Sequence, residues 1–423
     1  MSTVGGGVNI IKDGLVMYLD ASNTKSLADV PATNILLNSN AFENASWSTL
    51  NISVTANQAV SPSGLQDADL VDDGVVTNTQ HWIYQNPTFL YNTTYTLSIF
   101  AKYISRKYMT INIYNGVTSQ YVDYDILNGV IYGTTGDVTA SIQSYGNSWY
   151  RLSYTRTIAA TGSPNFRIAM ADDFGSESYT GSNKQVYLYG AQFELGSVAT
   201  TYIPTTTTSA SRIPVWSDVS KGGNNGTLTS GFTYNYSNGG SLVFDGVSNY
   251  VTIPNSDNIV FGNGDFTANV WIKFPLSSTG EGGAWGPILS KGCNTSAPAG
   301  TWWIAQTTSL TNRVTLNISS TTGGTFVTSL QSNDFSDGWH NICVNRNGAT
   351  SFMYSDGILI RTDTTSESNL SSIKPLTIGA TFITGITTQR TNTSMGITQI
   401  YNRALSAAEV LQNYNATKTR FGL

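Results

Sequence analysis

From about residue 50 onward, the chain repeats runs of alternating apolar and polar residues, each followed by a turn rich in Gly, Asn or Asp. Successive side chains of a β-strand point to opposite faces, so each run predicts a strand that buries one face and exposes the other. In residues 94–103, one face would carry Tyr95, Leu97, Ile99, Ala101 and Tyr103. Many short strands separated by turns are typical of sandwiches and barrels, so the sequence predicts an all-β fold.

Further runs of the same kind predict strands elsewhere in the chain. They cover residues 149–155, 241–244, 266–274, 312–318 and 341–346. The sequence Ser355-Asp356-Gly357, between two short runs, predicts a tight hairpin because Asp-Gly favours the positive φ angles of hairpin turns.

One short helix is predicted, near the carboxy terminus. Ser406 and Glu409 have the spacing of a capping box, in which each side chain bonds the backbone N–H of the other residue. Leu405 and Val410 have the spacing of a hydrophobic staple. We expect this helix to pack on the edge of a sandwich.

Two interruptions of the strand pattern predict domain boundaries. Tyr202-Ile203-Pro204 and the Thr- and Ser-rich residues up to Arg212 form a polar linker. A second boundary is expected near residues 28–33, around Pro31. The length of 423 residues allows two or three domains.

Composition narrows the classes of function. Only 11% of the residues are charged, against about 25% in a typical soluble domain, and the net charge is −5. Without a basic cluster, nucleic acid is not an expected partner. No apolar run reaches the roughly 18 to 20 residues of a membrane span, and the amino terminus lacks the positive start of a signal peptide. Cys293 and Cys343 are interpreted as incidental thiols, since one pair is no disulfide framework.

A set of short motifs runs through the second half of the chain. They are residues 216–228, Gly240-Ser-Leu-Val-Phe-Asp-Gly246, Tyr250-Val-Thr-Ile-Pro254, Gly338-Trp-His-Asn-Ile342, Pro375-Leu-Thr-Ile-Gly379 and Ile400-Tyr-Asn-Arg-Ala-Leu-Ser406. Through these motifs, residues 213–423 resemble the concanavalin A-like lectin/glucanase superfamily, in particular the laminin G-like sandwiches of bacteriophage structural proteins. The tail, residues 413–423, resembles the ending of many phage virion proteins with this domain. None of the motifs is catalytic.

The first strand of such a sandwich resembles residues 14–22, Gly14-Leu-Val-Met-Tyr-Leu-Asp-Ala-Ser22, and usually leads within a few residues into the stretch that starts here at Trp216. We therefore expect residues 1–32 and 213–423 to form one sandwich, with residues 33–212 inserted as a second domain. Insertion is tolerated when the termini of the inserted domain lie close together. Residues 34–47, 186–196 and 201–204 resemble the jelly-roll, carbohydrate-binding-module-like domains of phage and environmental bacterial proteins.

The sequence offers few residue patterns that are typical of catalytic sites. Glucanases on this fold carry two or three carboxylates at alternate positions of one strand, because acid and nucleophile flank one glycosidic bond about 5 Å apart. No such run exists here. The acids of residues 67–73 and Asp172-Asp173 are interpreted as solvated turn acids, His340 as a packed structural histidine, and His81 as a surface residue. We predict that the chain is not an enzyme.

Calcium is the one metal that the resemblance raises, because laminin G-like and lectin sandwiches often bind Ca²⁺ at loop ends through oxygen ligands. Such oxygens are offered by Asp245, Asn249, Asp257 and Asp265. Relatives, however, often have two consecutive acids where this chain has Ser248-Asn249, and an Asp-Glu pair where it has Thr398-Gln399. We predict no metal and no cofactor.

Glycan binding needs exposed aromatic rings for stacking on sugar faces. Trp285 is a candidate because it lies in a Gly-rich stretch that predicts a flexible loop. Trp302 and Trp303 are adjacent, so on a strand one of them must face away from the core. Trp82 and Tyr84 would share one face of a strand. For each of these residues, an ordinary core or rim position is the alternative.

Together these features favour a non-enzymatic bacteriophage virion protein, synthesised in the host cytoplasm and exposed on the particle surface as a capsid decoration, head fibre, tail fibre or other tail-associated adhesin. Its expected partners are other virion proteins, further copies of itself and host surface glycans; a trimer follows from the resemblance alone. Two alternatives stay open. One is a polysaccharide depolymerase or glucanase with carboxylates from distant strands, and the other is a purely structural cement protein.

Overall fold

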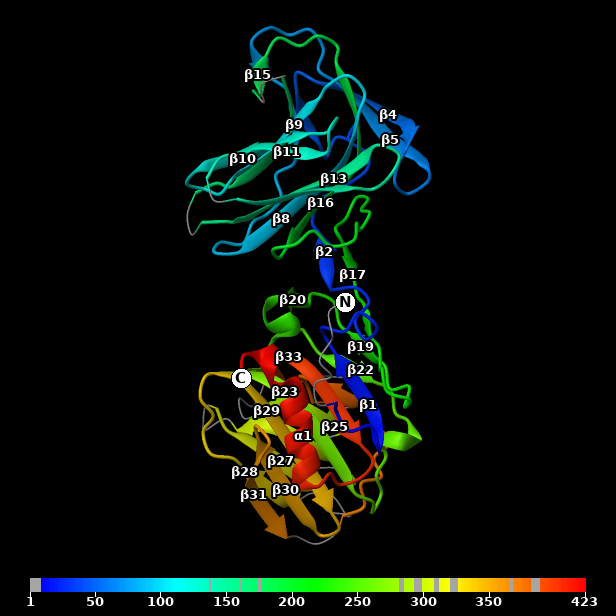
Figure 1. Cartoon of the computed structure of the whole chain (residues 1–423), viewed down its shortest axis with the longest axis vertical. Coiled ribbons are helices and arrows are strands. Elements are labelled where there is room, and N and C mark those ends of the chain that lie inside the picture. Colours follow the sequence, from blue (N-terminus) through cyan, green and yellow to red (C-terminus); the bar gives the residue numbers. More distant parts are fainter. Residues whose placement is uncertain are drawn as a thin grey trace, which may run out of the picture. The chain divides into compact units, whose positions relative to one another are not determined.

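A computed structural model describes the chain apart from residues 1–8, 137, 160–161, 173–175, 281–284, 293–298, 308–311, 320–325, 365–367 and 382–388. Its contacts divide the chain into two compact units (Figure 1). Unit 1 comprises Met1–Pro31 and Ile213–Leu423, and unit 2 comprises Ala32–Arg212. Nearly all regular structure is β-strand, which confirms the predicted fold class. Among the described residues, no helix has the length and apolarity needed to cross a membrane.

Unit 1 contains two large sheets. The nine-stranded sheet is built from β20 (Thr233–Asn235), β21 (Ser241–Asp245), β33 (Gln389–Tyr401), β23 (Phe266–Phe274), β29 (Gly338–Asn347), β30 (Thr350–Ser355) and β31 (Ile358–Thr364), with β1 (Leu15–Asp20) and β24 (Ser277–Gly280) also paired to β33. The eight-stranded sheet has the order β18 (Val215–Trp216), β19 (Gly226–Leu228), β22 (Val251–Ile253), β32 (Leu376–Ile378), β25 (Trp285–Lys291), β26 (Trp302–Thr307), β27 (Val314–Ser319) and β28 (Phe326–Gln331). β1 and β33, from opposite ends of the sequence, are antiparallel neighbours (Figure 1).

The core of unit 1 is formed by alternate residues of these strands. In β23, Ala268, Val270 and Ile272 belong to the main apolar cluster. Trp271 points to the opposite face of the sheet, where its ring stacks on Phe421 with the ring centres 4.1 Å apart. The alternation seen in the sequence therefore separates a sandwich core from a second, aromatic layer.

The single α-helix of the described residues, α1 (Ala407–Thr417), covers that second layer. Ser406 and Glu409 form the predicted capping box, and Leu405 and Val410 are buried together. The helix lies over Tyr401 and Cys343, whose side chains leave the sheet on the face opposite the core. It thus packs on a sheet face rather than on the predicted sandwich edge. Cys343 is a buried free thiol, and Cys293 lies outside the described residues.

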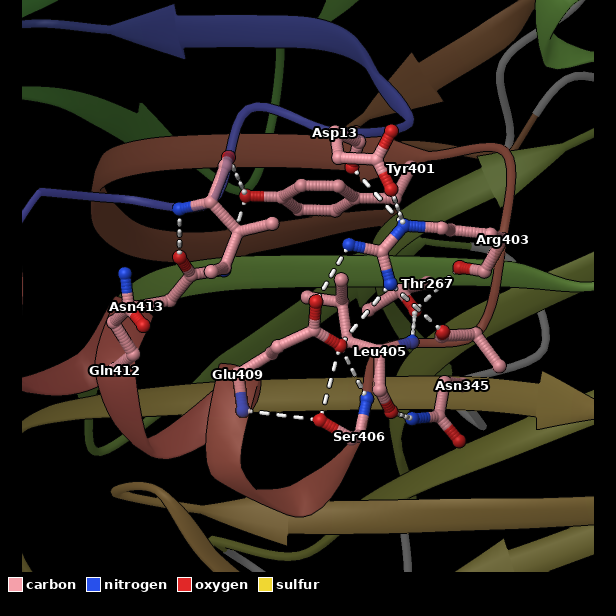
Figure 2. A network of polar contacts seen from close by, with 12 residues as sticks. Asp13, Thr267, Asn345, Tyr401, Arg403, Leu405, Ser406, Glu409, Gln412 and Asn413 are labelled. Atoms are coloured by element: carbon pink, nitrogen blue, oxygen red, sulfur yellow. Dashed lines mark hydrogen bonds and ion pairs between the residues drawn. The ribbon is translucent and has the colours of Figure 1, made fainter.

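A polar network joins this helix to the start of the chain (Figure 2). Arg403 donates to both carboxylate oxygens of Glu409, at 3.1 and 2.7 Å, and pairs with Asp13 at 2.9 Å. Asn413 accepts a hydrogen bond from the backbone N–H of Ile11 at 2.8 Å. The two ends of unit 1 are therefore fastened to each other by side chains as well as by the β1–β33 pair.

Unit 2 contains two six-stranded sheets. One has the order β11 (Val130–Thr134), β10 (Ser119–Asp125), β9 (Tyr108–Tyr114), β14 (Asn165–Ala171), β7 (Trp82–Tyr84) and β3 (Ser48–Leu50), and is called sheet C here. The other has the order β12 (Thr139–Ser144), β13 (Trp149–Thr157), β8 (Thr94–Tyr103), β16 (Gln185–Leu195), β5 (Gln66–Asp72) and β4 (Ser53–Val60). Two further pairs are β6 (Thr79–Gln80) with β15 (Ser178–Tyr179), and β2 (Ala32–Asn34) with β17 (Ala210–Arg212).

The core of unit 2 contains the alternate residues that the sequence pattern singled out. Tyr95, Leu97, Ile99 and Ala101 of β8 are buried in it, and Tyr103 packs against it. Ile83, Ile111 and Ile168, from the middle strands of sheet C, point into the same core. The residues on either side of these isoleucines therefore lie on the other face of sheet C. The first and last strands of the unit pair with each other, so that its two ends lie side by side.

Candidate functional site

Strand β7 presents two aromatic rings on the face of sheet C that points away from the core. Its central residue, Ile83, is buried, while Trp82 and Tyr84 on either side of it are partly exposed. β3 lies on one side, with Leu50 opposite Trp82 and Ser48 opposite Tyr84. β14 lies on the other side, with Ala169 opposite Trp82. Trp82 and Tyr84 thus share one open face, as the sequence predicted.

These rings line a hollow of about 410 Å³. The residues around it are Thr49, Leu50, Trp82, Tyr84, Asn86, Asn165 and Arg167. The guanidinium carbon of Arg167 lies 4.0 Å from the centre of the Trp82 ring, a cation–π distance. The Oδ1 atom of Asn165 is buried and has no hydrogen-bond partner among the described residues. Two aromatic rings, the side-chain amides of Asn86 and Asn165 and one guanidinium group therefore line the same hollow. Such a combination of rings and polar groups is typical of binding sites for small polar ligands that stack one face on an aromatic ring.

A second hollow of about 320 Å³ lies on the same face of sheet C. It is lined by Gln80, Thr110, Asn112, Ser119, Tyr121, Ser176, Glu177 and Ser178. Asn112 of β9 is the cross-strand partner of Arg167 of β14, so the two hollows adjoin at this pair. Ser119 donates a hydrogen bond of 2.9 Å to Oδ1 of Asn112. The two hollows together form the candidate site.

One carboxyl group, that of Glu177, lines the second hollow, and a second, that of Asp123, is bonded to the lining residue Thr110. Burial raises the pKa of Asp123, although Thr110 donates a hydrogen bond of 2.5 Å to its Oδ1 atom and thereby opposes the shift. Burial also raises the pKa of Glu177, a shift that Arg167 opposes and Asp123 reinforces. The Oε1 atom of Glu177 is buried without a partner among the described residues. Both acids are thus harder to ionise than free carboxyl groups.

The three tryptophans of unit 1 that were predicted as glycan-binding residues do not lie in an open hollow of this kind. Trp302 is 1% exposed and belongs to the main core. Trp303 faces away from that core, as predicted, but is also 1% exposed because Trp285 and Phe326 cover it. Trp285 is the first residue of β25 rather than part of a loop, and its ring centre lies 5.3 Å from that of Trp303. Trp302 and Trp303 therefore offer no open ring face, which removes them from the candidate surface.

His340 contacts both a serine and an aspartate. Its Nδ1 atom lies 2.7 Å from Oδ2 of Asp356, and its Nε2 atom lies 3.1 Å from Oγ of Ser336. A serine, a histidine and an aspartate in this order are also found in hydrolase triads. Here, however, Nε2 lies equally close, at 3.1 Å, to the carbonyl oxygen of Ser336, an acceptor for its N–H. The ring also packs against Phe335, with centres 5.2 Å apart, so its contacts are those of a packed structural histidine.

Two acids that were interpreted as solvated, and one histidine that was interpreted as a surface residue, are buried instead. Asp69, 1% exposed, accepts hydrogen bonds from the backbone N–H groups of Phe42 and Asn57, and burial raises its pKa to about 6. Asp73 is fully buried and forms an ion pair with Arg106. His81 is also fully buried, so the surface position expected for it is wrong. Asp69 and Asp73 are thus enclosed by partners from other segments of the chain.

The oxygen atoms considered for calcium are largely taken up by protein groups. Asp245 accepts hydrogen bonds from the backbone N–H groups of Val247, Ser248 and Asn249, and these bonds lower its pKa against the effect of burial. Asp265 accepts one from the backbone of Gly348 at 2.8 Å. Within the described ranges, no three His, Cys, Asp or Glu side chains are grouped so that they could hold a metal ion.

Comparison with known proteins places a family match in unit 1. Residues 245–411 match the family described as the Concanavalin A-like lectin/glucanases superfamily. The matched range includes most of the strands of both large sheets of unit 1. The chain therefore contains a concanavalin A-like, laminin G-like sandwich with a lectin-like fold. A comparison with curated proteins found no match.

Three solved structures with partial similarity to this chain are toxin binding domains. The binding domain of Paraclostridial Mosquitocidal Protein 1 is 14% identical, with a TM-score of 0.38 over 47% of this chain and 49% of that chain. The Botulinum Neurotoxin serotype G binding domain is 17% identical, with a TM-score of 0.37 over 47% of each chain. The binding domain of Botulinum Neurotoxin DC in complex with SialylT is 14% identical, with a TM-score of 0.36 over 48% of each. The aligned part is thus about half the length of each of these structures.

Sequence reasoning found the two rings of the candidate site but missed Arg167 and Asn165. Both occupy alternate positions of a strand whose other residues are apolar, which is a signal for the outer face of a sheet. Nothing in the sequence indicates that this strand lies beside Trp82, because the pairing of β14 with β7 joins segments more than eighty residues apart. The candidate site therefore depends on the pairing of β14 with β7, which the sequence alone does not predict.

Proposed function

We propose that the chain is a non-enzymatic structural protein of a bacteriophage virion, exposed on the particle surface, and that unit 2 binds host glycans weakly. The observation that carries the glycan part is the hollow of about 410 Å³ that two aromatic rings of one strand line together with amides and an arginine. Aromatic side chains stack on the apolar faces of sugars, and amides and guanidinium groups bond the hydroxyls. Unit 2 is then a carbohydrate-binding, jelly-roll-like domain inserted into a laminin G-like sandwich.

The virion part is supported by two features. The motifs of residues 213–423, including the tail, resemble those of phage structural proteins with this domain. The low charge content of 11% also suits close packing against neighbouring subunits, because few charges must be desolvated in an interface. The proposed partners are other virion proteins and further copies of this chain. The particle location would be that of a capsid decoration, head fibre or tail-associated adhesin.

Binding of the full chain to an array of bacterial surface glycans tests the glycan part. We expect micromolar to millimolar affinity that falls at least tenfold in Trp82→Ala and in Tyr84→Ala. Tyr145→Ala is the matched control, since Tyr145 is 44% exposed and lines neither hollow. Retention of binding in both site variants would refute this assignment. Release of new reducing ends from the glycans would instead favour a depolymerase.

Purified particles test the virion part. An antibody against the chain should label intact virions in negative-stain images, and mass spectrometry should find the chain in the particle. Its absence from purified virions would refute the proposal. Presence in the particle without affinity for any glycan would leave a purely structural cement protein.

A further inference from the structure

We propose that the hollow at Trp82 selects glycans that carry a carboxylate, and that Arg167 is the residue that recognises it. This inference rests on the proposed function, since it names the class of sugar that the same site takes. Arg167 is the only cationic residue among those that line the two hollows. Any preference for charge at this site must therefore come from its guanidinium group.

Arg167 differs from several other arginines of the described residues, whose guanidinium groups are bonded to acceptors. Arg106 pairs with Asp73, Arg420 pairs with Asp20, and Arg346 donates to backbone carbonyl groups. By contrast, the Arg167 side chain makes no hydrogen bond or ion pair among the described residues; its guanidinium group lies over the Trp82 ring and close enough to Glu177 to oppose the rise of the pKa of that residue. The N–H donors of this half-buried guanidinium group are therefore available to an acceptor of a bound ligand.

The stacking on Trp82 prepares this group for a carboxylate. A guanidinium group over an indole is held in a fixed plane and loses part of its hydration. Its paired N–H groups match the two oxygens of a carboxylate, which accept two parallel charge-assisted hydrogen bonds. A sugar hydroxyl satisfies one donor at a time and brings no charge. The site should therefore discriminate between a carboxylated sugar and the same sugar with its carboxyl group reduced to an alcohol.

The adjoining hollow sets where the carboxylate lies. Glu177 lines that hollow and Asp123 lies next to its lining residue Thr110, and either acid, when ionised, repels a second carboxylate. The acidic sugar should consequently occupy the end with Trp82 and Tyr84. A neutral neighbouring sugar would extend toward Asn112 and Glu177, whose amide and carboxyl groups bond hydroxyls. The ligand class is thus a glycan in which a carboxylated residue is linked to a neutral one.

The test compares matched glycans on the full chain by isothermal titration calorimetry. One arm uses oligosaccharides that contain a hexuronic acid, a second uses sialylated oligosaccharides, and each is paired with its carboxyl-reduced counterpart. We expect at least one acidic glycan to bind ten- to a hundredfold more tightly than its reduced form. Arg167→Gln should remove that difference, because the affinity for the acidic form should fall to that for the reduced form. The arm with the larger difference identifies the source of the carboxylate.

Controls separate this inference from the proposed function. Arg313→Gln removes one exposed positive charge from unit 1 and should leave the preference unchanged. Equal affinity for acidic and reduced glycans, with both lost in Trp82→Ala, would overturn the inference and leave glycan binding in place. No affinity for any glycan would overturn the proposed function itself. A preference for acidic over reduced glycans that survives in Arg167→Gln would also overturn the role of Arg167. An unchanged thermal melting temperature would show that this variant is folded.

Discussion

His340 and Asp356 face each other across neighbouring strand ends of unit 1, with Nδ1 of the imidazole 2.7 Å from Oδ2 of the carboxylate. Asp356 is the first central residue of the β30–β31 hairpin turn and has a positive φ of 51°, so it is held in place by the turn itself. Its Oδ1 atom accepts a hydrogen bond of 2.9 Å from the backbone N–H of Asn341. The hairpin predicted from Ser355-Asp356-Gly357 thus also anchors the only histidine of the laminin G-like motif.

This pair should make the stability of unit 1 depend on pH. The hydrogen bond to Asp356 raises the pKa of His340 above its ordinary value of 6.5. The ion pair therefore contributes fully below the unfolded pKa and is lost as the pH rises through the raised folded pKa. We expect His340→Gln to cost about 1 kcal/mol at pH 5.5 and clearly less at pH 9, measured by chemical denaturation. Equal costs at both pH values would contradict this, and Asp356→Asn should abolish the pH dependence of the difference.

The cap of helix α1 is a second measurable contribution. Ser406 accepts a hydrogen bond from the N–H of Glu409, and Arg403 and Ser406 bond the Glu409 carboxylate, which lowers its pKa to about 2 (Figure 2). Ser406→Ala should lower the free energy of unfolding by about 1 kcal/mol because an N-terminal N–H group loses its acceptor. Ser406→Asp keeps an acceptor and is the control. A Ser406→Ala chain as stable as the wild type in urea denaturation would argue against the cap.

The fold class, the long strands and the capped helix could be predicted from local sequence patterns. The bounds of β8 and β23 agree with residues 94–103 and 266–274, because long alternating runs leave one way to bury the apolar face. The capping box was predictable because both partners lie within one helical turn. Local signals of this kind fixed the fold class and the single helix.

The features that were missed depend on distant partners. Alternation showed that Trp303 faces away from the core, but not that Trp285 and Phe326 cover that face. Likewise, the pattern placed Trp82 and Tyr84 together but gave no hint of Arg167, which reaches them from another strand. Period-two patterns specify which face a residue lies on, and only the order of strands specifies what lies beside it.

The different burial of Trp303 and Trp82 predicts different effects of their substitution on stability and on glycan binding. Trp303→Ala should destabilise unit 1 by about 3 to 5 kcal/mol, because a large side chain leaves a cavity among the neighbouring rings. Trp82→Ala should cost about 1 kcal/mol or less, since this ring is partly exposed, and should act on glycan binding instead. Denaturation curves and glycan titrations of both variants check this. A Trp303→Ala chain of normal stability that loses glycan binding would reverse the assignment.

The buried ion pair of unit 2 gives the last prediction. Asp73 and Arg106 are almost fully buried, and Oδ1 of Asp73 also accepts hydrogen bonds from the backbone N–H groups of Ser182 and Lys184, at 3.1 and 2.8 Å. Arg106→Met should cost about 3 to 5 kcal/mol, because it leaves a buried carboxylate without its cation. Adding Asp73→Asn removes that charge and keeps an acceptor for the two N–H groups, so the double variant should regain part of the loss. A double variant that is less stable than Arg106→Met in calorimetry would show that the hydrogen bonds of the carboxylate, rather than its charge, dominate at this position.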